Sequence, residues 1–114
     1  MRIERELMRG AGPVAVLQIL AERAMYGYEL ATELECRSRG VLEMGHSTLY
    51  PLLYNLEAKG WVAAAWREAR SGRDRKYYRL TAKGQAVLKE QRAQWRAVTD
   101  AMRRLGVMAP EPGT

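Results

Sequence analysis

The stretch GHSTLYPLLYNLEAKGW, residues 45–61, decides how the rest of the chain is interpreted. Four leucines in it recur at intervals of three and four residues, which places them on one face of an α-helix. These are Leu49, Leu52, Leu53 and Leu56. The residues that fall mostly outside this face are Thr48, Tyr50, Tyr54 and Asn55. The pattern predicts a helix of about three turns with one packing face and one face free to contact a partner.

The ends of this helix carry their own signals. Ser47 is a candidate N-cap, because its hydroxyl can accept a hydrogen bond from a first-turn N–H group. Gly60 suits the left-handed residue that ends a helix. Pro51 falls at the end of the first turn, where it costs one hydrogen bond and stiffens the helix. Taken alone, the leucine stripe favours an ordinary core helix; the segment after it favours a DNA-recognition helix.

Composition places the chain among soluble globular proteins. It has 114 residues, of which 47% are hydrophobic and 28% charged, so we expect one domain that benefits from dimerisation. No apolar run is long enough to span a bilayer, and residues 1–6 lack the apolar core of a signal peptide. We therefore expect a cytoplasmic protein with no membrane partner. Cys36, the single cysteine, has no partner for a disulfide or a metal site and is expected to act as a small hydrophobe.

The positive charge of the chain is concentrated in one segment. The formal net charge is +6, from 19 basic and 13 acidic residues. Residues 67–79 contain six basic and two acidic side chains, whereas residues 29–57 contain two basic and five acidic ones. A localised basic patch predicts a polyanionic partner more strongly than a diffuse excess does.

Two further helices are expected before residue 45. Residues 2–9 form a weak amphipathic helix at best, and Gly12-Pro13 then starts a helix that runs to about Ala24. A second helix opens at Tyr26-Gly27-Tyr28 and ends before Gly40. Residues 41–44 are expected to form a short extended link. The order is helix, helix, link, helix.

A β-hairpin is expected after Gly60. Residues 61–67 and 76–80 have strand character, although the alanines at 63–65 also tolerate a helix, and the residues between them supply turn chemistry. Two strands alone are marginally stable, so the hairpin must pack on the helices. The expected fold is therefore mainly α with a two-stranded β-wing, a winged helix-turn-helix.

The last helix carries a second periodicity. Thr81 caps it, it spans residues 82–105, Gly106 stops it, and Pro110 and Pro112 belong to a disordered tail. Its apolar seam follows a heptad spacing through Gly84, Leu88, Gln91, Trp95, Val98, Met102 and Leu105. The seam could simply face the core, but a small core cannot cover three heptads. From Leu88 onward we therefore predict a homodimer interface.

This layout predicts binding to double-stranded DNA. The recognition helix would present His46, Ser47, Thr48, Tyr50 and Tyr54 to a major groove, and its positive dipole end favours phosphate. The hairpin would contact the flanking backbone or minor groove through Arg70, Arg73, Arg75 and Lys76. The alternatives are a solvated turn, or a winged-helix module that binds an acidic protein surface without DNA.

The chain resembles the PadR-like transcriptional regulators in their short single-domain form. The motifs that carry the resemblance are Tyr26–Leu30 (YGYEL), Ser47–Leu53 (STLYPLL), Leu56-Glu57, Gly60-Trp61, Gly72-Arg73, Arg75–Thr81 (RKYYRLT) and Gly84, and they cover most of residues 13–84. The resemblance implies a dimeric winged-helix regulator, usually a repressor that a small molecule releases from its operator. It also implies that Trp95 stacks with its two-fold mate around a flat hydrophobic ligand. We add Gln91 and Val98 to this expected site.

The sequence contains no pattern that predicts an enzyme. It has one histidine, no carboxylate pair beside a nucleophile, no phosphate-binding glycine loop and no zinc-ligand set, so neither catalysis, a metal nor a cofactor is expected. We expect three parts: a DNA-binding domain over residues 1–80, a dimerisation helix over 81–106 and a disordered tail over 107–114.

Overall fold

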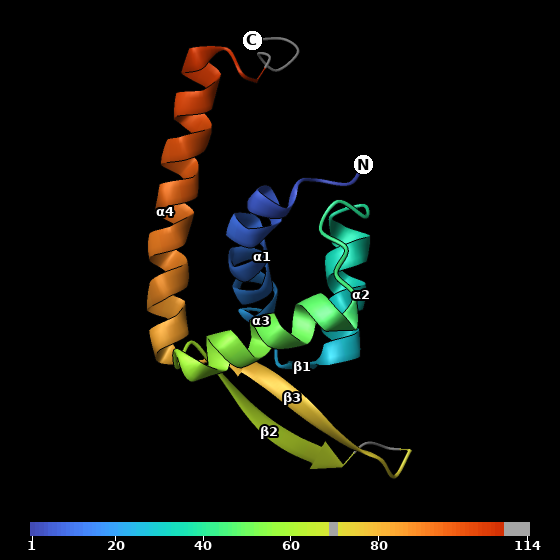
Figure 1. Ribbon diagram of the computed structural model, residues 1–114. Coiled ribbons are helices and arrows are strands. Elements are labelled where there is room, and N and C mark those ends of the chain that lie inside the picture. Colours follow the sequence, from blue (N-terminus) through green and yellow to red (C-terminus); the bar gives the residue numbers. More distant parts are fainter. Residues whose placement is uncertain (69–70, 109–114) are drawn as a thin grey trace.

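The computed structural model of the chain describes residues 1–68 and 71–108. These residues form four helices and three strands (Figure 1). In chain order the elements are α1 (Arg5–Leu20), β1 (Met25–Tyr26), α2 (Gly27–Arg37), α3 (His46–Ala58), β2 (Val62–Glu68), β3 (Asp74–Leu80) and α4 (Ala82–Leu105). The predicted mainly α fold with a β-wing and a long last helix is confirmed.

The sheet contains one strand more than the sequence predicted. Its order is β1-β3-β2, and both pairings are antiparallel. In β1, Met25 pairs with Tyr78 and Tyr26 pairs with Tyr77. The expectation of a two-stranded wing was therefore incomplete, because a two-residue strand is too short to show any periodicity. The β2–β3 hairpin itself has the predicted position.

The first helix is longer than expected and contains Pro13 in its interior. The predicted start at Gly12-Pro13 and the predicted end near Ala24 were both wrong, since α1 is continuous over Arg5–Leu20. Pro13 costs one backbone hydrogen bond but does not end the helix. A Cβ atom at Gly12 would lie 3.1 Å from the Met44 side chain. The Gly-Pro pair thus marks a close contact of α1 with the segment before α3, not a helix start.

The core lies behind α3, between α1, α2 and the sheet. Leu49, Leu53 and Leu56 of α3 are buried, and Leu52 is half-buried, so the leucine stripe forms the packing face as predicted. The remaining buried hydrophobic residues are Val16, Leu17, Ile19, Leu20, Met25, Leu30, Leu34, Met44, Val62, Tyr78 and Leu88. The link over residues 41–44 forms turns and irregular chain, not the expected extended piece.

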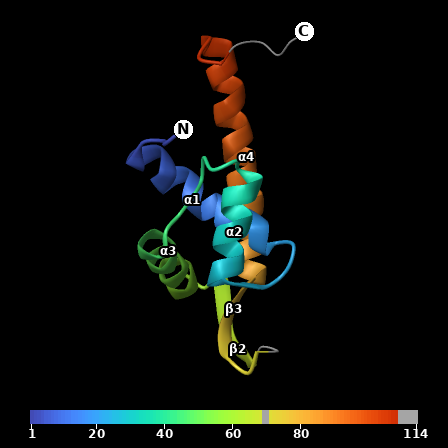
Figure 2. The ribbon, with the colours of Figure 1, turned by 90° about the vertical axis from the view of Figure 1, so that its right-hand side faces the viewer.

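The last helix has the predicted ends. The Thr81 hydroxyl accepts a hydrogen bond from the Gly84 N–H at 3.0 Å, and Gly106 takes a left-handed conformation with φ of 87°. A Cβ atom at Gly84 would lie 2.0 Å from the Trp61 carbonyl oxygen, so only glycine allows this approach of α4 to the hairpin. Beyond Leu88 the helix extends away from the rest of the molecule, and Figure 2 shows the hairpin and the distal half of α4 at opposite ends.

Two sequence expectations concern the regions outside this core. Within residues 1–68 and 71–108, no helix combines the length and the apolar character needed to cross a bilayer. The predicted disordered tail falls mainly on residues 109–114, which lie outside the described residues.

Candidate nucleic-acid interface

The ends of α3 were predicted correctly at one end only. The helix begins at His46, and Gly45 is its N-cap, so the prediction of Ser47 as the cap was wrong. The Gly45 carbonyl accepts hydrogen bonds from the N–H groups of Thr48 and Leu49, and no side chain is needed there. The Ser47 hydroxyl makes no capping bond and stays on the exposed face. At the other end Gly60 has a φ of 78°, which confirms the left-handed residue.

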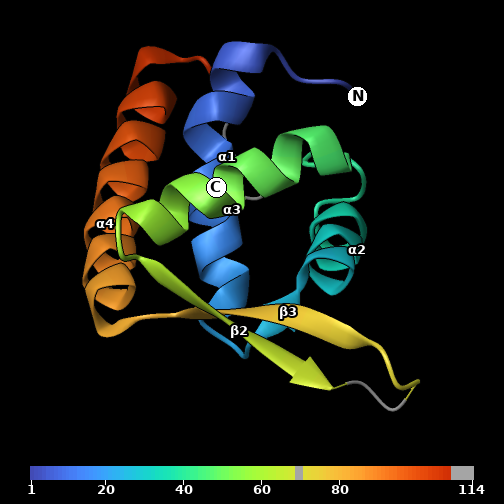
Figure 3. The ribbon, with the colours of Figure 1, turned by 60° about the horizontal axis from the view of Figure 1, so that its bottom comes forward.

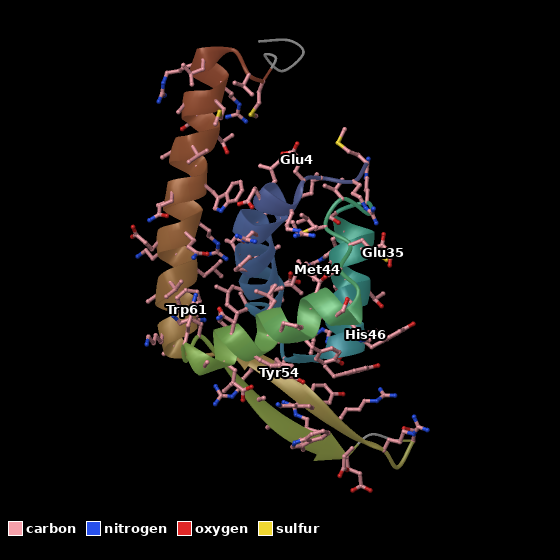
Figure 4. The ribbon with its side chains drawn as sticks, in the orientation of Figure 1. Glu4, Glu35, Met44, His46, Tyr54 and Trp61 are labelled. Atoms are coloured by element: carbon pink, nitrogen blue, oxygen red, sulfur yellow. The ribbon has the colours of Figure 1, made fainter. Side chains whose placement is uncertain are left out.

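The outer face of α3 is polar and exposed along its length. Of the residues predicted to read DNA, His46, Ser47, Thr48 and Tyr54 are exposed. Figure 4 shows His46 at the start of α3 and Tyr54 on its hairpin side. The other exposed residues of the helix are Pro51, Asn55 and Ala58. A single helix thus presents hydroxyl, imidazole, phenol and amide groups outward, which are groups that can hydrogen-bond to base edges.

Tyr50 differs from the other predicted reading residues, because it is half-buried. Its ring stacks on His46 with centroids 5.5 Å apart and planes 11° apart, and it also contacts Tyr54 at 6.2 Å. A Cβ atom at Gly27 would lie 2.3 Å from the Tyr50 hydroxyl oxygen. Gly27 therefore lets the start of α2 meet α3, and Tyr50 connects the two helices while its ring supports His46.

One face of the hairpin turns toward α3. The Lys76 ammonium lies 3.8 Å from a Glu57 carboxylate oxygen and 5.3 Å from the Tyr54 ring centroid. Lys76, predicted as a DNA contact, is half-buried and connects the hairpin to α3. Its cross-strand partner Trp66 leaves 69% of its surface exposed. Sequence reasoning missed Trp66, although a tryptophan in an alternating strand beside a basic hairpin was a signal that could have identified it.

The opposite face of the hairpin holds arginines against tyrosines. The Arg75 guanidinium lies 4.4 Å above the Tyr26 ring, and the Arg67 guanidinium lies 4.6 Å above the Tyr77 ring. The two tyrosines meet edge to face across β1 and β3, with centroids 5.5 Å apart. Each cation is therefore supported by an aromatic face while its edge remains available. Sequence reasoning found Arg75 but missed Arg67, its direct cross-strand neighbour.

The tip of the hairpin carries the most accessible of the described wing cations. Arg73 is exposed and follows Gly72, which has a φ of 81° and so makes the turn that brings Arg73 outward. Arg70, also predicted to bind DNA, lies outside the described residues. Of the predicted wing residues, Arg73 is thus free-standing, whereas Arg75 and Lys76 are held by contacts within the chain.

Tyr78 supports the contact between α3 and the hairpin from below. It is fully buried, and its hydroxyl has no hydrogen-bond partner among the described residues. Burial raises the pKa of Tyr78 to about 12, and the nearby Tyr54, Glu57 and Tyr50 add to the shift. The phenol is therefore neutral at physiological pH and acts as part of the apolar floor beneath α3.

The predicted seam of α4 divides into two parts. Leu88 is buried and Gln91 is half-buried, whereas Trp95, Val98, Met102 and Leu105 are exposed. Trp95 leaves 42% of its surface uncovered. Gln91, Trp95 and Val98, the predicted ligand site, share one side of the helix through their spacing, and within a single chain this side faces outward. The dimer interface and the ligand site both stay predictions.

No cluster of three or more His, Cys, Asp or Glu side chains that could hold a metal ion occurs in the described part of the chain.

Comparison with known proteins agrees with this geometry. The sequence model of the transcriptional regulator PadR-like family matches residues 16–90. A transcriptional regulator of Mycobacterium tuberculosis is 38% identical over 88 residues, which are 77% of this chain and 78% of that protein. A PadR family transcriptional regulator from Eggerthella lenta has a similar structure, with a TM-score of 0.75 and 39% identity over 88% of this chain and 85% of that one. A PadR-like regulator from Bacillus cereus gives a TM-score of 0.79 and 26% identity, covering 91% and 99% of the two chains.

Proposed function

Because the chain belongs to the PadR-like family of transcriptional regulators, we propose that it is a dimeric repressor that binds specific sites in double-stranded DNA. This is a family of regulators and not of enzymes. The observation that carries the proposal is the exposed polar face of α3 beside a basic hairpin. In this proposal residues 1–80 bind DNA and residues 81–106 dimerise, in the cytoplasm.

The role of α3 is to read base edges. An α-helix fits the major groove, and residues at its N-terminal end reach furthest into it. His46, Ser47 and Thr48 occupy that end and are exposed. Because Gly45 caps the helix through its backbone alone, the Ser47 hydroxyl remains free for a base or phosphate. The positive end of the helix dipole adds a favourable interaction with the backbone.

The role of the hairpin is to hold the DNA backbone. Arg73 at the tip contacts phosphate or enters the minor groove, where an arginine is favoured by the negative potential. Arg67 and Arg75 present their guanidinium edges from fixed positions over Tyr77 and Tyr26. These contacts carry affinity more than specificity, because phosphates have the same charge at every base pair.

Dimerisation through α4 would set the spacing of the two recognition helices. The exposed seam with Trp95, Val98 and Met102 supports a second copy as the cover for the distal half of the helix. A two-fold dimer recognises a pseudo-palindrome with half-sites about one helical turn apart.

A flat apolar effector would bind between the two Trp95 side chains. A tryptophan on a two-fold seam offers a large face for stacking, and Gln91 one turn away can hold a polar edge. Titration with planar aromatic compounds would show quenching of Trp fluorescence and loss of operator affinity. The Trp95→Leu variant is the control, because Trp61 and Trp66 also emit. Quenching that is equal in both proteins would leave Trp95 as a packing residue.

A protein-binding winged helix is the second candidate, and Trp66 is the observation that favours it. Its side chain is 69% exposed on the hairpin, and exposed aromatic residues are typical of protein interfaces. In that case the arginines of the hairpin would contact acidic groups of a protein partner.

Titration with an arbitrary duplex at a series of salt concentrations separates the two functions. A DNA-binding protein shows a linear fall of log affinity with log salt, with a slope of about −0.9 for each phosphate contact. Arg73→Ala should reduce this slope by about 0.9. Absence of salt-dependent binding by the wild-type protein at low salt would contradict the proposal and favour the protein-binding module.

A further inference from the structure

An open cleft of about 1450 Å³ lies beside α3, on the side away from the hairpin. Its walls come from residues 1–13, the loop 39–45 and one edge of α3. Figure 3 shows α3 running between the N-terminal segment on one side and the β2–β3 hairpin on the other. None of the roles proposed above involves this cleft.

The exposed face of α3 extends from the hairpin to the cleft without interruption. On the hairpin edge, Tyr54 and Glu57 meet Lys76. On the other edge, Thr48 and Asn55 line the cleft. Pro51, also exposed, lies between these edges by helical geometry and reaches the cleft wall. The surface that would enter a major groove is therefore bordered by the hairpin on one side and by the cleft on the other.

The cleft is lined mainly by cations. The basic residues are Arg2, Arg5, Arg9, Arg39 and Lys59, and the one acidic residue lining it is Glu43. Arg9 lies 3.8 Å from a Glu6 oxygen in an ion pair whose side chains are 70% and 77% exposed, which makes it a weak interaction. Lys59 places its ammonium 4.6 Å above the Trp61 ring. Within the described part of the chain, Arg2, Arg5 and Arg39 form no ion pair.

Two of these arginines occupy positions that local backbone physics disfavours. Arg39 has a φ of 53°, a left-handed conformation that glycine or asparagine adopts more easily, and it is followed by Gly40 with a φ of 81°. Arg5 is in the first turn of α1, where the helix dipole disfavours a cation. Local stability therefore does not explain either arginine, whereas an anionic partner in the cleft does.

We propose that Arg5, Arg9 and Arg39 bind the sugar–phosphate backbone on the far side of the major groove that α3 occupies. The groove is about 12 Å wide and is bounded by a backbone on each side, so a helix within it has phosphates at both edges. The hairpin takes one of these backbones and the cleft takes the other. This inference rests on the proposed function and adds a second, independent phosphate contact to it. The competing occupant is a small organic anion, because Met8, Met44 and Leu52 give the cleft an apolar floor.

The test compares two double variants that remove the same charge. Arg5→Gln/Arg9→Gln changes the cleft, and Lys89→Gln/Arg96→Gln changes exposed residues of α4 that lie outside its heptad seam. Each protein is titrated with a duplex of about 30 base pairs, long enough to span two half-sites one turn apart, over a series of salt concentrations. The cleft variant should lower the slope of log affinity against log salt by about 1.8, that is by about 0.9 for each lost contact. The α4 variant should keep the wild-type slope.

Arg39→Gln provides a second and separate measurement, with an expected fall in slope of about 0.9. All substituted side chains are exposed, so thermal unfolding should match the wild type. If the wild type binds DNA with a steep salt dependence and both cleft variants keep its slope, this inference is overturned while the proposed function stands. An equal loss of slope in the α4 variant would also overturn it, since the effect would then be one of net charge. A wild type without salt-dependent binding would instead contradict the proposed function itself.

Discussion

The helices α3 and α4 each leave one face uncovered, and the two faces differ in chemistry. The uncovered face of α3 carries polar residues such as Ser47 and Thr48, and basic side chains lie on both sides of it. The distal half of α4 instead exposes Trp95, Val98 and Met102. A polar face beside cations suits a hydrated polyanion, whereas an apolar seam gains free energy only by contact with another apolar surface. One chain thus presents two surfaces that suit two different kinds of partner.

The largest expected effect is on the apolar face. Met102→Asp places a charge in the proposed seam, and we expect the dimer dissociation constant to rise at least about 1000-fold, or about 4 kcal/mol. Light scattering at micromolar concentration should show a dimer for the wild type and a monomer for the variant. Ala93→Asp is the matched control, because Ala93 is exposed and lies outside the seam. A monomeric wild type would remove the contrast between the two helices.

The next effect separates the two halves of α4. Leu88 is 1% exposed, and Leu88→Ala should lower the free energy of unfolding by about 2–5 kcal/mol because it leaves a cavity in the subunit core. Val107, which is 69% exposed just beyond the helix, should tolerate alanine within about 0.5 kcal/mol. Urea unfolding measures both changes. Similar losses in the two variants would show that the core does not end near Leu88.

A smaller effect is expected on the polar face. Thr48→Ala should reduce the preference for the operator over random DNA by about 1 kcal/mol, since one base contact is lost. Thr32→Ala on α2 is the control, because the Thr32 hydroxyl bonds locally to the Tyr28 carbonyl. Competition binding measures the preference. If Thr48→Ala weakens operator and random DNA by the same factor, Thr48 contacts phosphate and not a base.

The smallest effect at neutral pH concerns the residue beneath α3. Tyr78→Phe removes a buried hydroxyl that has no partner among the described residues, so stability should change by less than about 1 kcal/mol at pH 7. Burial raises the Tyr78 pKa from 10.0 to about 12, which means that the folded state favours the protonated phenol. That stability is fully present below pH 10 and is lost as the pH rises toward 12.

Unfolding experiments at alkaline pH would therefore separate the two proteins. The wild type should lose more stability than Tyr78→Phe between pH 10 and pH 12, because only the wild type must ionise this buried phenol to unfold fully. Parallel pH profiles would show that Tyr78 is accessible to solvent.

Much of the fold could be predicted because its signals are local. Gly60, Thr81 and Gly106 end or begin helices through their own backbone and side-chain chemistry, and the structure has them in those roles. Pro13 was interpreted wrongly because a proline at a helix start and a proline inside a helix look alike in sequence. The contact of Gly12 with Met44, which no local pattern contains, makes the difference.

The candidate site was predicted as a set of residues but not as an arrangement. The sequence identified Arg75 and Lys76 as basic, but it could not show that Arg75 stacks on Tyr26 or that Lys76 meets Glu57. Both contacts join segments that are distant in sequence. Tyr50 was assigned to the exposed face for the same reason, since its fit over Gly27 depends on how α2 and α3 meet.

Selection of binding sites from random duplexes tests most directly whether the exposed face of α3 reads DNA sequence. The wild-type protein should enrich a pseudo-palindrome with half-sites about 10 base pairs apart, centre to centre. His46→Ala and Ser47→Ala should each enrich a site that has become degenerate at particular positions of the half-site. Failure of the wild type to enrich any sequence, or enrichment of one unchanged site by all three proteins, would contradict the account.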